Sequence, residues 1–205
     1  MVSSLEVNFL QYFARRFGQS RRMKSNRIRN CCIALLAQSA ILASTVIAAE
    51  TNKLDEALEP LRPFIGRTWR GEFKHASPDK RTIDVARWER ALNGKGIRVL
   101  HSINDGSYGG ESIIHWDREK KEIRYHYFST AGFNNTGTMS VSNNVLTAVE
   151  KVSGNGNGVT EVRSTYELRK DGTMLNRSQY LKNGAPTGDR EVLYKEDASA
   201  EVKFK

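Results

Sequence analysis

The chain is poor in cysteine, and this limits what can stabilise it. It has two cysteines, Cys31 and Cys32, and both lie within residues 1–49 of the 205. The segment that follows has no cysteine, so it can form no disulfide and offers no thiol as a nucleophile or a metal ligand. Its stability must come from a buried apolar core, and residues 50–205 are enough to form one such domain.

Residues with catalytic or metal-binding chemistry are also scarce. Of the four histidines, His115 and His126 lie near Asp117, but their spacing is not diagnostic of a zinc site. The sequence has no Gly-x-Ser-x-Gly elbow, no phosphate-binding loop with its Lys-Ser/Thr, and no distinctive pair of carboxylates. We therefore predict no catalytic residues and no metal ligands, and we favour a protein that is not an enzyme.

The positive charge does not indicate a nucleic-acid-binding domain. The formal net charge is +9, but seven basic residues and only one acidic residue precede Ala49. That region therefore carries +6 of the total, and the remaining chain has mixed charges suited to solubility. Because a basic patch is the usual electrostatic footprint of a nucleic-acid-binding domain, we expect no nucleic-acid partner.

The first 49 residues have the pattern of a leader. Lys24, Arg27 and Arg29 precede an apolar run that extends from Cys31 to Ile47, and Ala48-Ala49 follows it. This is the layout of a secretory signal peptide, so we predict cleavage after Ala48 or Ala49, with Met23 as a second candidate for the true start. The expected domain then spans residues 50–205, is periplasmic or secreted, and keeps no stable membrane anchor after cleavage. An uncleaved N-terminal anchor is the alternative, although the run is marginal as a membrane span.

Residues 68–195 alternate between short strands and turns. Leu54, Leu58 and Leu61 first predict a short helix over residues 52–62, which Pro60 and Pro63 should end. The predicted strands are 68–75, 81–92, 96–103, 110–117, 122–129, 135–142, 145–152, 160–168, 173–181 and 189–195. Short links such as Asn93-Gly94, Asp171-Gly172 and Asn183-Gly184 suit tight hairpins and exclude parallel crossovers. We predict an all-β fold, an antiparallel up-and-down barrel of about ten strands, since closure removes bare edges.

The alternation within the strands predicts which side chains face the interior. The inward faces should combine apolar residues with five polar or aromatic candidates for ligand binding: His101, Tyr125, Tyr127, Arg177 and Gln179. Unpaired Arg and Gln are costly in a solid core, whereas a ligand cavity uses such groups as anchors. The alternative for Arg177 is a position at the barrel mouth with its charged head in water.

Short motifs carry a resemblance to a known family. Residues 64–72, Phe-Ile-Gly-Arg-Thr-Trp-Arg-Gly-Glu, are similar to the first strand of lipocalin-like barrels, although the spacing from Gly66 to Trp69 is one residue longer than Gly-x-Trp. The order of Arg87-Trp88-Glu89, Gly110-Glu111-Ser112 and Ile114-His115-Trp116-Asp117 also resembles a bacterial exported family of lipocalin-like domains of unknown function. The resemblance implies the calycin architecture and a habit of binding, with Trp69 as a plug of the barrel base.

A haem-binding relative is a further comparison. Trp69-Arg70-Gly71 matches the opening of nitrobindin-like barrels, which hold haem through a histidine late in the chain. The histidines here are His75, His101, His115 and His126, and none lies in the last strands. We therefore expect no haem and no other cofactor, and His101 is the one histidine to test.

Three hypotheses follow. The first is an exported binding or carrier barrel that holds a small, partly apolar molecule. The second is an enzyme on the same barrel, with His101 or His115 as acid or base. The third is an interaction protein with a filled barrel and an outer patch around Trp116 and Phe128. A cavity of several hundred Å³ would separate the first two from the third.

Overall fold

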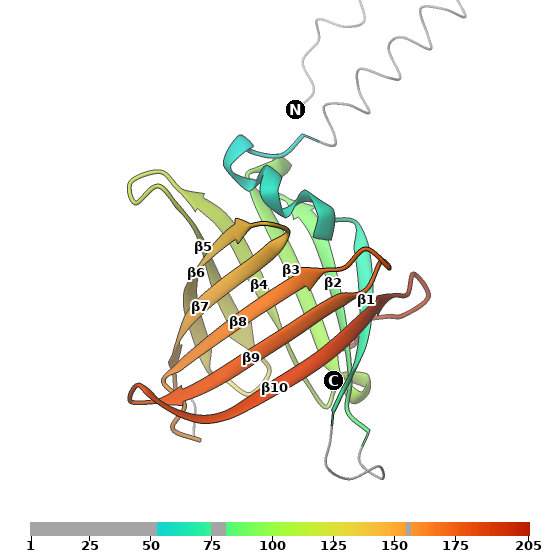
Figure 1. Cartoon of the computed structure of the whole chain (residues 1–205), viewed down its shortest axis with the longest axis vertical. Coiled ribbons are helices and arrows are strands. Elements are labelled where there is room, and N and C mark those ends of the chain that lie inside the picture. The colour runs from blue at the N-terminus through green and yellow to red at the C-terminus, as the bar shows by residue number, and fades with distance from the viewer. Residues whose placement is uncertain (1–52, 75–80, 155–156) are drawn as a thin grey trace, which may run out of the picture. The chain divides into compact units, whose positions relative to one another are not determined.

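The structure is a computed structural model that describes residues 53–74, 81–154 and 157–205. The predicted leader lies outside these residues. The described chain forms a closed barrel of ten antiparallel strands (Figure 1). The strands are β1 (Arg67–Phe73), β2 (Ile83–Ala91), β3 (Gly96–Ile103), β4 (Tyr108–Asp117), β5 (Glu122–Ser129), β6 (Asn134–Ser142), β7 (Val145–Ser153), β8 (Glu161–Leu168), β9 (Met174–Lys182) and β10 (Ala185–Glu196).

Each strand pairs with the next one in the sequence, and β1 pairs with β10 to close the barrel. The predicted all-β, up-and-down barrel is confirmed. The ranges 96–103 and 122–129 coincide with β3 and β5. The predicted strand 189–195 is too short, because β10 begins directly after the turn and continues through a register shift between Pro186 and Gly188.

The tight turns have the backbone conformation that their residues favour. Asn183 and Gly184 join β9 to β10 with φ of 50° and 83°, the pair of positive values that suits a two-residue hairpin. Gly94 (φ 84°) follows β2 and also makes a close approach, because a Cβ there would lie 2.0 Å from the carbonyl oxygen of Lys53. The turn after β2 therefore packs directly against the chain that enters the N-terminal helix.

That helix, η1 (Glu56–Phe64), is a 3₁₀ helix and not an α-helix. The expectation that Pro60 and Pro63 would end it was wrong, since both lie inside it. Side chains three residues apart share one face of a 3₁₀ helix, and Leu58, Leu61 and Phe64 have this spacing and are buried. Burial of this face holds the segment despite the two amide donors that proline removes.

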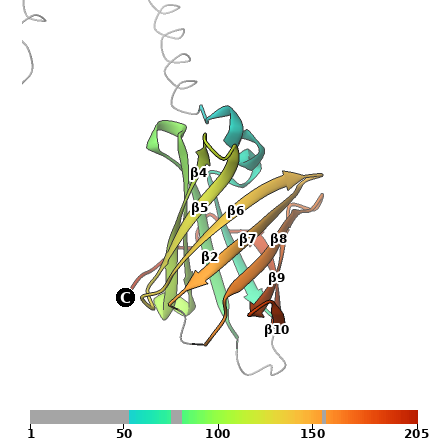
Figure 2. The ribbon, with the colours of Figure 1, turned by 90° about the vertical axis from the view of Figure 1, so that its left-hand side faces the viewer.

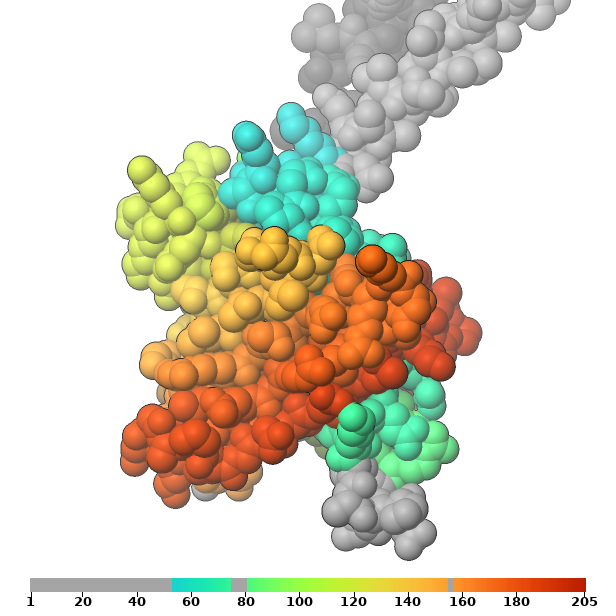
Figure 3. Space-filling model, viewed as in Figure 1, coloured from blue at the N-terminus to red at the C-terminus, as the bar shows by residue number. Residues whose placement is uncertain are grey.

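The helix η1 covers one end of the barrel. It lies over the same end of the strands in two views at right angles (Figures 1 and 2), and in the space-filling view it covers the upper rim (Figure 3). Phe64 contacts Trp88 with ring centroids 5.3 Å apart. We call this the closed end. The turns after β3, β5, β7 and β9 lie at the opposite end, since the strands alternate in direction.

The C-terminal segment 197–205 runs back along β1 and β3. The amide of Asp197 donates to the carbonyl of Thr68, and the amide of Lys203 donates to Ser102 Oγ at 3.0 Å. The chain therefore ends beside the turn after β3, where Lys203 pairs with Asp105. In the described ranges we find no helix with the length and apolarity to span a bilayer.

Candidate functional site: an interior cavity

The barrel contains a cavity of about 590 Å³. Its lining comes from β2 to β10 and extends to Val159 and Thr187 near the end opposite η1. Toward the closed end the wall is apolar, with Trp88, Ile114, Met139 and Met174. Trp69 is fully buried and is not part of the lining. The rest of the wall combines apolar residues with polar and titratable ones.

A chain of hydrogen bonds crosses the polar part of the cavity. His101 Nδ1 lies 2.9 Å from Asp84 Oδ1, and His101 Nε2 lies 2.9 Å from the Tyr127 hydroxyl. The hydroxyls of Tyr108 and Tyr127 are 2.8 Å apart, and Tyr194 donates to Asp84 Oδ2 at 2.7 Å. The tautomer with the proton on Nδ1 donates to the Asp84 carboxylate and accepts from Tyr127 at Nε2. Both oxygens of the buried Asp84 are therefore occupied.

A second polar group is centred on Glu150. Its Oε2 accepts from the hydroxyl of Tyr125 at 3.1 Å and from Nδ2 of Asn135 at 3.2 Å. Burial raises the pKa of Glu150, although the bonds from Asn135 and Tyr125 and the charge of Arg190 oppose the shift. Burial also raises the pKa of Tyr125 and of Tyr127, so both hydroxyls stay protonated at neutral pH.

Arg190 lies on β10 and lines the same cavity. Its Nε is buried without a hydrogen-bond partner. Its guanidinium carbon stands 4.8 Å from the ring centre of Phe73 and 5.9 Å from that of Tyr180, so aromatic faces flank the charge.

A smaller buried pair completes the polar wall. Ser164 Oγ and Ser178 Oγ are 2.9 Å apart, and the Asn176 amide donates to the carbonyl of Thr165. Among the described residues, no group of three or more His, Cys, Asp or Glu could hold a metal ion. The arrangement can hold a molecule with an apolar part and a few polar groups.

Comparison with known proteins supports the barrel. No protein-family profile matches the chain, and no curated protein sequence does. One similar solved structure is that of Rv2717c from M. tuberculosis, with a TM-score of 0.52 at 16% identity. The alignment covers 71% of this chain and 99% of that one. The two proteins share a fold, and this similarity does not show membership of the lipocalin-like family.

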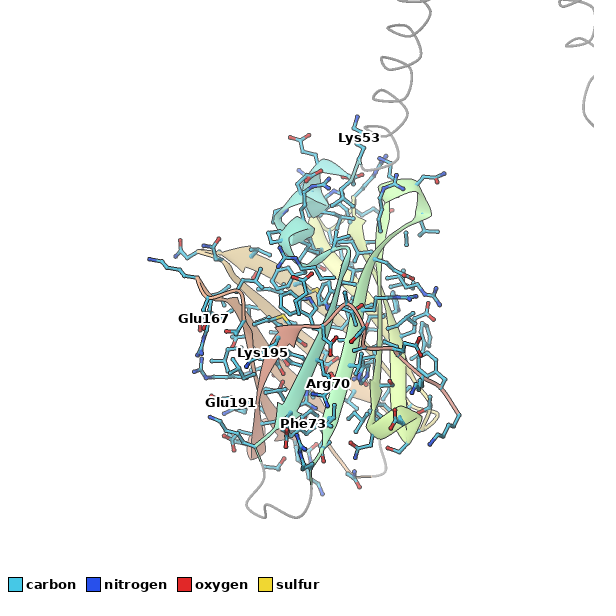
Figure 4. All side chains as sticks on the ribbon, turned by 90° about the vertical axis from the view of Figure 1, so that its right-hand side faces the viewer. Lys53, Arg70, Phe73, Glu167, Glu191 and Lys195 are labelled. Carbon is cyan, nitrogen blue, oxygen red and sulfur yellow. The ribbon has the colours of Figure 1, made fainter. Side chains whose placement is uncertain are left out.

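Three of the five predicted ligand-binding residues face the cavity. His101, Tyr125 and Tyr127 line it, each on the face that the alternation indicated. The inward orientation of Arg177 and Gln179 was wrong, because both are exposed on the outside of β9. Arg177 Nε bonds to Glu191 Oε2 at 2.9 Å. Figure 4 shows Glu191 and Glu167 on the outer side of the sheet.

The error on β9 has a physical reason. The prediction followed Leu175 and Leu181, which are buried but lie outside both the core cluster and the cavity lining. The inward face instead carries Met174, Asn176, Ser178 and Tyr180. A polar-lined cavity is an exception to the rule that apolar side chains face the interior, since polar side chains can point into it.

Sequence reasoning missed Asp84, Tyr108, Glu150 and Arg190. The sequence does contain a signal for Asp84, Glu150 and Arg190. Each lies an even number of residues from buried apolar neighbours on its strand, and therefore on the same face as they do. Asp84 precedes Ala86 and Trp88, Glu150 follows Leu146 and Ala148, and Arg190 precedes Val192 and Tyr194. A charge on an otherwise apolar face marks an interior polar group.

Proposed function

We propose that the domain is an exported, lipocalin-like binding or carrier protein that holds a small, partly apolar molecule inside its barrel. The observation that carries the proposal is the cavity of about 590 Å³, which lies within the size range of small-molecule sites. The export component rests on the leader pattern alone. Mature protein should begin at Ala49 or Glu50 on N-terminal sequencing, and a mature chain that still contained Met1 would contradict export.

The wall of the cavity supports a ligand of mixed character. One side is apolar around Ile114 and Met174, whereas Asn135 Oδ1 and Arg190 Nε are buried polar atoms without a partner in the described chain. Buried polar atoms normally have partners, so a ligand or trapped water is expected beside them. A filled barrel that acts only through its surface is less favoured, and Trp116, proposed for such a patch, packs against the core.

An enzyme is the second candidate, favoured by one observation. Asp84, His101 and Tyr127 form a hydrogen-bonded series in which the carboxylate orients the imidazole and the imidazole meets a hydroxyl. Such an arrangement is typical of acid–base sites. Burial raises the pKa of Tyr127, however, so its hydroxyl stays neutral. A neutral phenol suits the positioning of a ligand better than it suits a reactive role as phenolate.

Filling the cavity tests the binding proposal. Ala148 points inward on β7 and is buried, whereas its neighbour Thr147 is exposed on the outer face. Ala148→Trp should reduce binding of the fluorescent probe 8-anilinonaphthalene-1-sulfonate by at least about tenfold, because the indole occupies the space of the ligand. Thr147→Trp on the same strand should leave it unchanged.

The natural ligand can be sought directly. Native mass spectrometry of protein purified from the periplasm should show an additional small mass that disappears in the Ala148→Trp variant. Ala148→Phe provides a milder filling if the tryptophan variant does not fold. Equal probe binding by wild type, Ala148→Phe and Thr147→Trp would show that the probe, and with it the proposed site, is not in the cavity.

A further inference from the structure

Arg190 differs from the arginines on the outside of the barrel. Several surface arginines are paired with carboxylates, as in Arg98 with Glu111, Arg163 with Glu161 and Arg177 with Glu191. Arg190 has no ion pair and no hydrogen bond to another residue of the described ranges, although it lines the cavity. A buried guanidinium without an ion pair is costly, because arginine stays ionised and cannot neutralise itself.

The two carboxyl groups of the same cavity act on the charge of Arg190 from a distance, but neither forms an ion pair with it. Asp84 has both oxygens occupied, by His101 and by Tyr194. Glu150 is held by Tyr125 and Asn135 on another part of the wall, and burial favours its neutral form by raising its pKa. The cavity wall therefore has one positive group without an ion pair and two acids that already accept hydrogen bonds from other residues.

We infer that Arg190 is the anchor for an anionic head group, and that the ligand is an amphipathic organic anion. This inference rests on the proposed binding function and specifies its ligand class. A carboxylate or phosphate would accept from the terminal N–H groups of the guanidinium, as such groups do from arginine elsewhere. Phe73 and Tyr180 on either side of the guanidinium limit its side-chain freedom and orient its fork.

The apolar part of the ligand then has a defined direction. From Arg190 the cavity extends to the wall formed by Trp88, Ile114, Met139 and Met174 near the closed end. An alkyl or ring system placed there buries its surface, and burial of apolar surface contributes the larger share of affinity. The head group is thereby held on the β10 wall and the tail beneath η1.

A matched series of probes tests the head group. Decanoate, decyl phosphate, decan-1-ol and decylammonium share one alkyl chain, and each is titrated into delipidated protein by calorimetry or by displacement of 8-anilinonaphthalene-1-sulfonate. The two anions should bind at least about tenfold more tightly than the alcohol, because hydrogen bonds to a charged group are among the stronger ones. The ammonium should bind most weakly. The ratio between decanoate and decyl phosphate indicates which of the two head groups the natural ligand has.

Substitution of Arg190 tests the residue. Arg190→Met keeps the approximate length of the side chain and should remove the preference for anions, while binding of decan-1-ol is retained. Arg190→Lys should keep part of the preference, since it keeps the charge and loses the fork. Arg177→Met, on the outer face of the neighbouring strand, is the control and should not alter it. Thermal melts and circular dichroism of all three variants report on the fold.

The outcomes separate the two proposals. Equal binding of decanoate and decan-1-ol by wild type, or an unchanged preference in folded Arg190→Met, would overturn the anionic head group and leave the binding barrel intact. Failure of all four probes to bind wild type, or to displace the dye, would overturn both.

Discussion

The closed end of the barrel and its cavity differ in how their side chains are packed. At the closed end η1 buries Leu58, Leu61 and Phe64 in the core, with Phe64 in contact with Trp88. In the cavity the chain instead arranges Asp84, His101 and Tyr127 in hydrogen bonds and leaves space between the walls. Stability is therefore expected to depend mainly on the closed end, and recognition mainly on the cavity. Four substitutions can break or sharpen this division.

The largest effect is expected at the closed end. Leu58→Ala should lower the free energy of unfolding by about 2–5 kcal/mol, since it opens a void under a fully buried helix face. Chemical denaturation followed by tryptophan fluorescence measures this. Glu59→Ala, one residue along at a half-exposed site whose carboxylate pairs with Arg62, should change the free energy of unfolding little. Similar losses in the two variants would mean that η1 contributes no core.

The next effect concerns the hydrogen-bonded series in the cavity. Tyr194→Phe removes a 2.7 Å bond to a buried carboxylate and should cost about 1.5–3 kcal/mol. Tyr166→Phe is the matched control, because Tyr166 also lines the cavity and no hydrogen bond joins its hydroxyl to another described residue. Denaturant midpoints of the two variants should differ clearly. Equal midpoints would show that the Asp84 contact contributes no net stability.

The third effect appears in the pH dependence. Burial raises the pKa of Glu150, so the folded state binds its proton more tightly than the unfolded state. The stabilisation that this gives is complete below the unfolded pKa and is lost as the pH rises through the folded pKa. Glu150→Gln keeps an acceptor for Tyr125 and should flatten the fall in melting temperature from acidic to neutral pH. If the two profiles run parallel, Glu150 does not titrate in this window.

The sequence predicts the strand topology of this molecule better than the type of its N-terminal helix. The turns and alternation were sufficient for the barrel, because Asn183-Gly184 and the short links allow only antiparallel neighbours. The inward faces of β3 and β5 were also predicted, as His101, Tyr125 and Tyr127 show. The 3₁₀ character of η1 was not, because Leu54, Leu58 and Leu61 suit an α-helix as well.

The polar wall was harder to predict for a reason that β9 and β10 illustrate. On β9 the apolar Leu175 and Leu181 were taken to mark the interior, whereas the cavity face is set by Asn176 and Ser178. The alternation separates the side chains of a strand into two faces, but it does not show which face points into a polar-lined cavity. That choice follows from pairing with β8 and β10, which positions Ser178 opposite Ser164 and Arg190. The position of Arg190 in the cavity wall thus follows from its pairing with Ser178 on β9 and not from the sequence pattern alone.

The smallest effect is expected outside the barrel. Arg177→Leu removes contacts to Glu191 and Glu167 on the outer face, where the arginine side chain is 54% exposed. Exposed ion pairs contribute about 0–1 kcal/mol because water and salt screen them, so the free energy of unfolding should change by no more than this. Binding of 8-anilinonaphthalene-1-sulfonate should not change, since the side chain lies on the other side of the sheet from the cavity. Titrating wild type and variant with the dye, and measuring both denaturant midpoints at low and high salt, checks the two expectations together. A loss of dye binding in Arg177→Leu with an unchanged midpoint would place the dye on the outer face of β9 and β10, and would remove the distinction between the two sides of this wall.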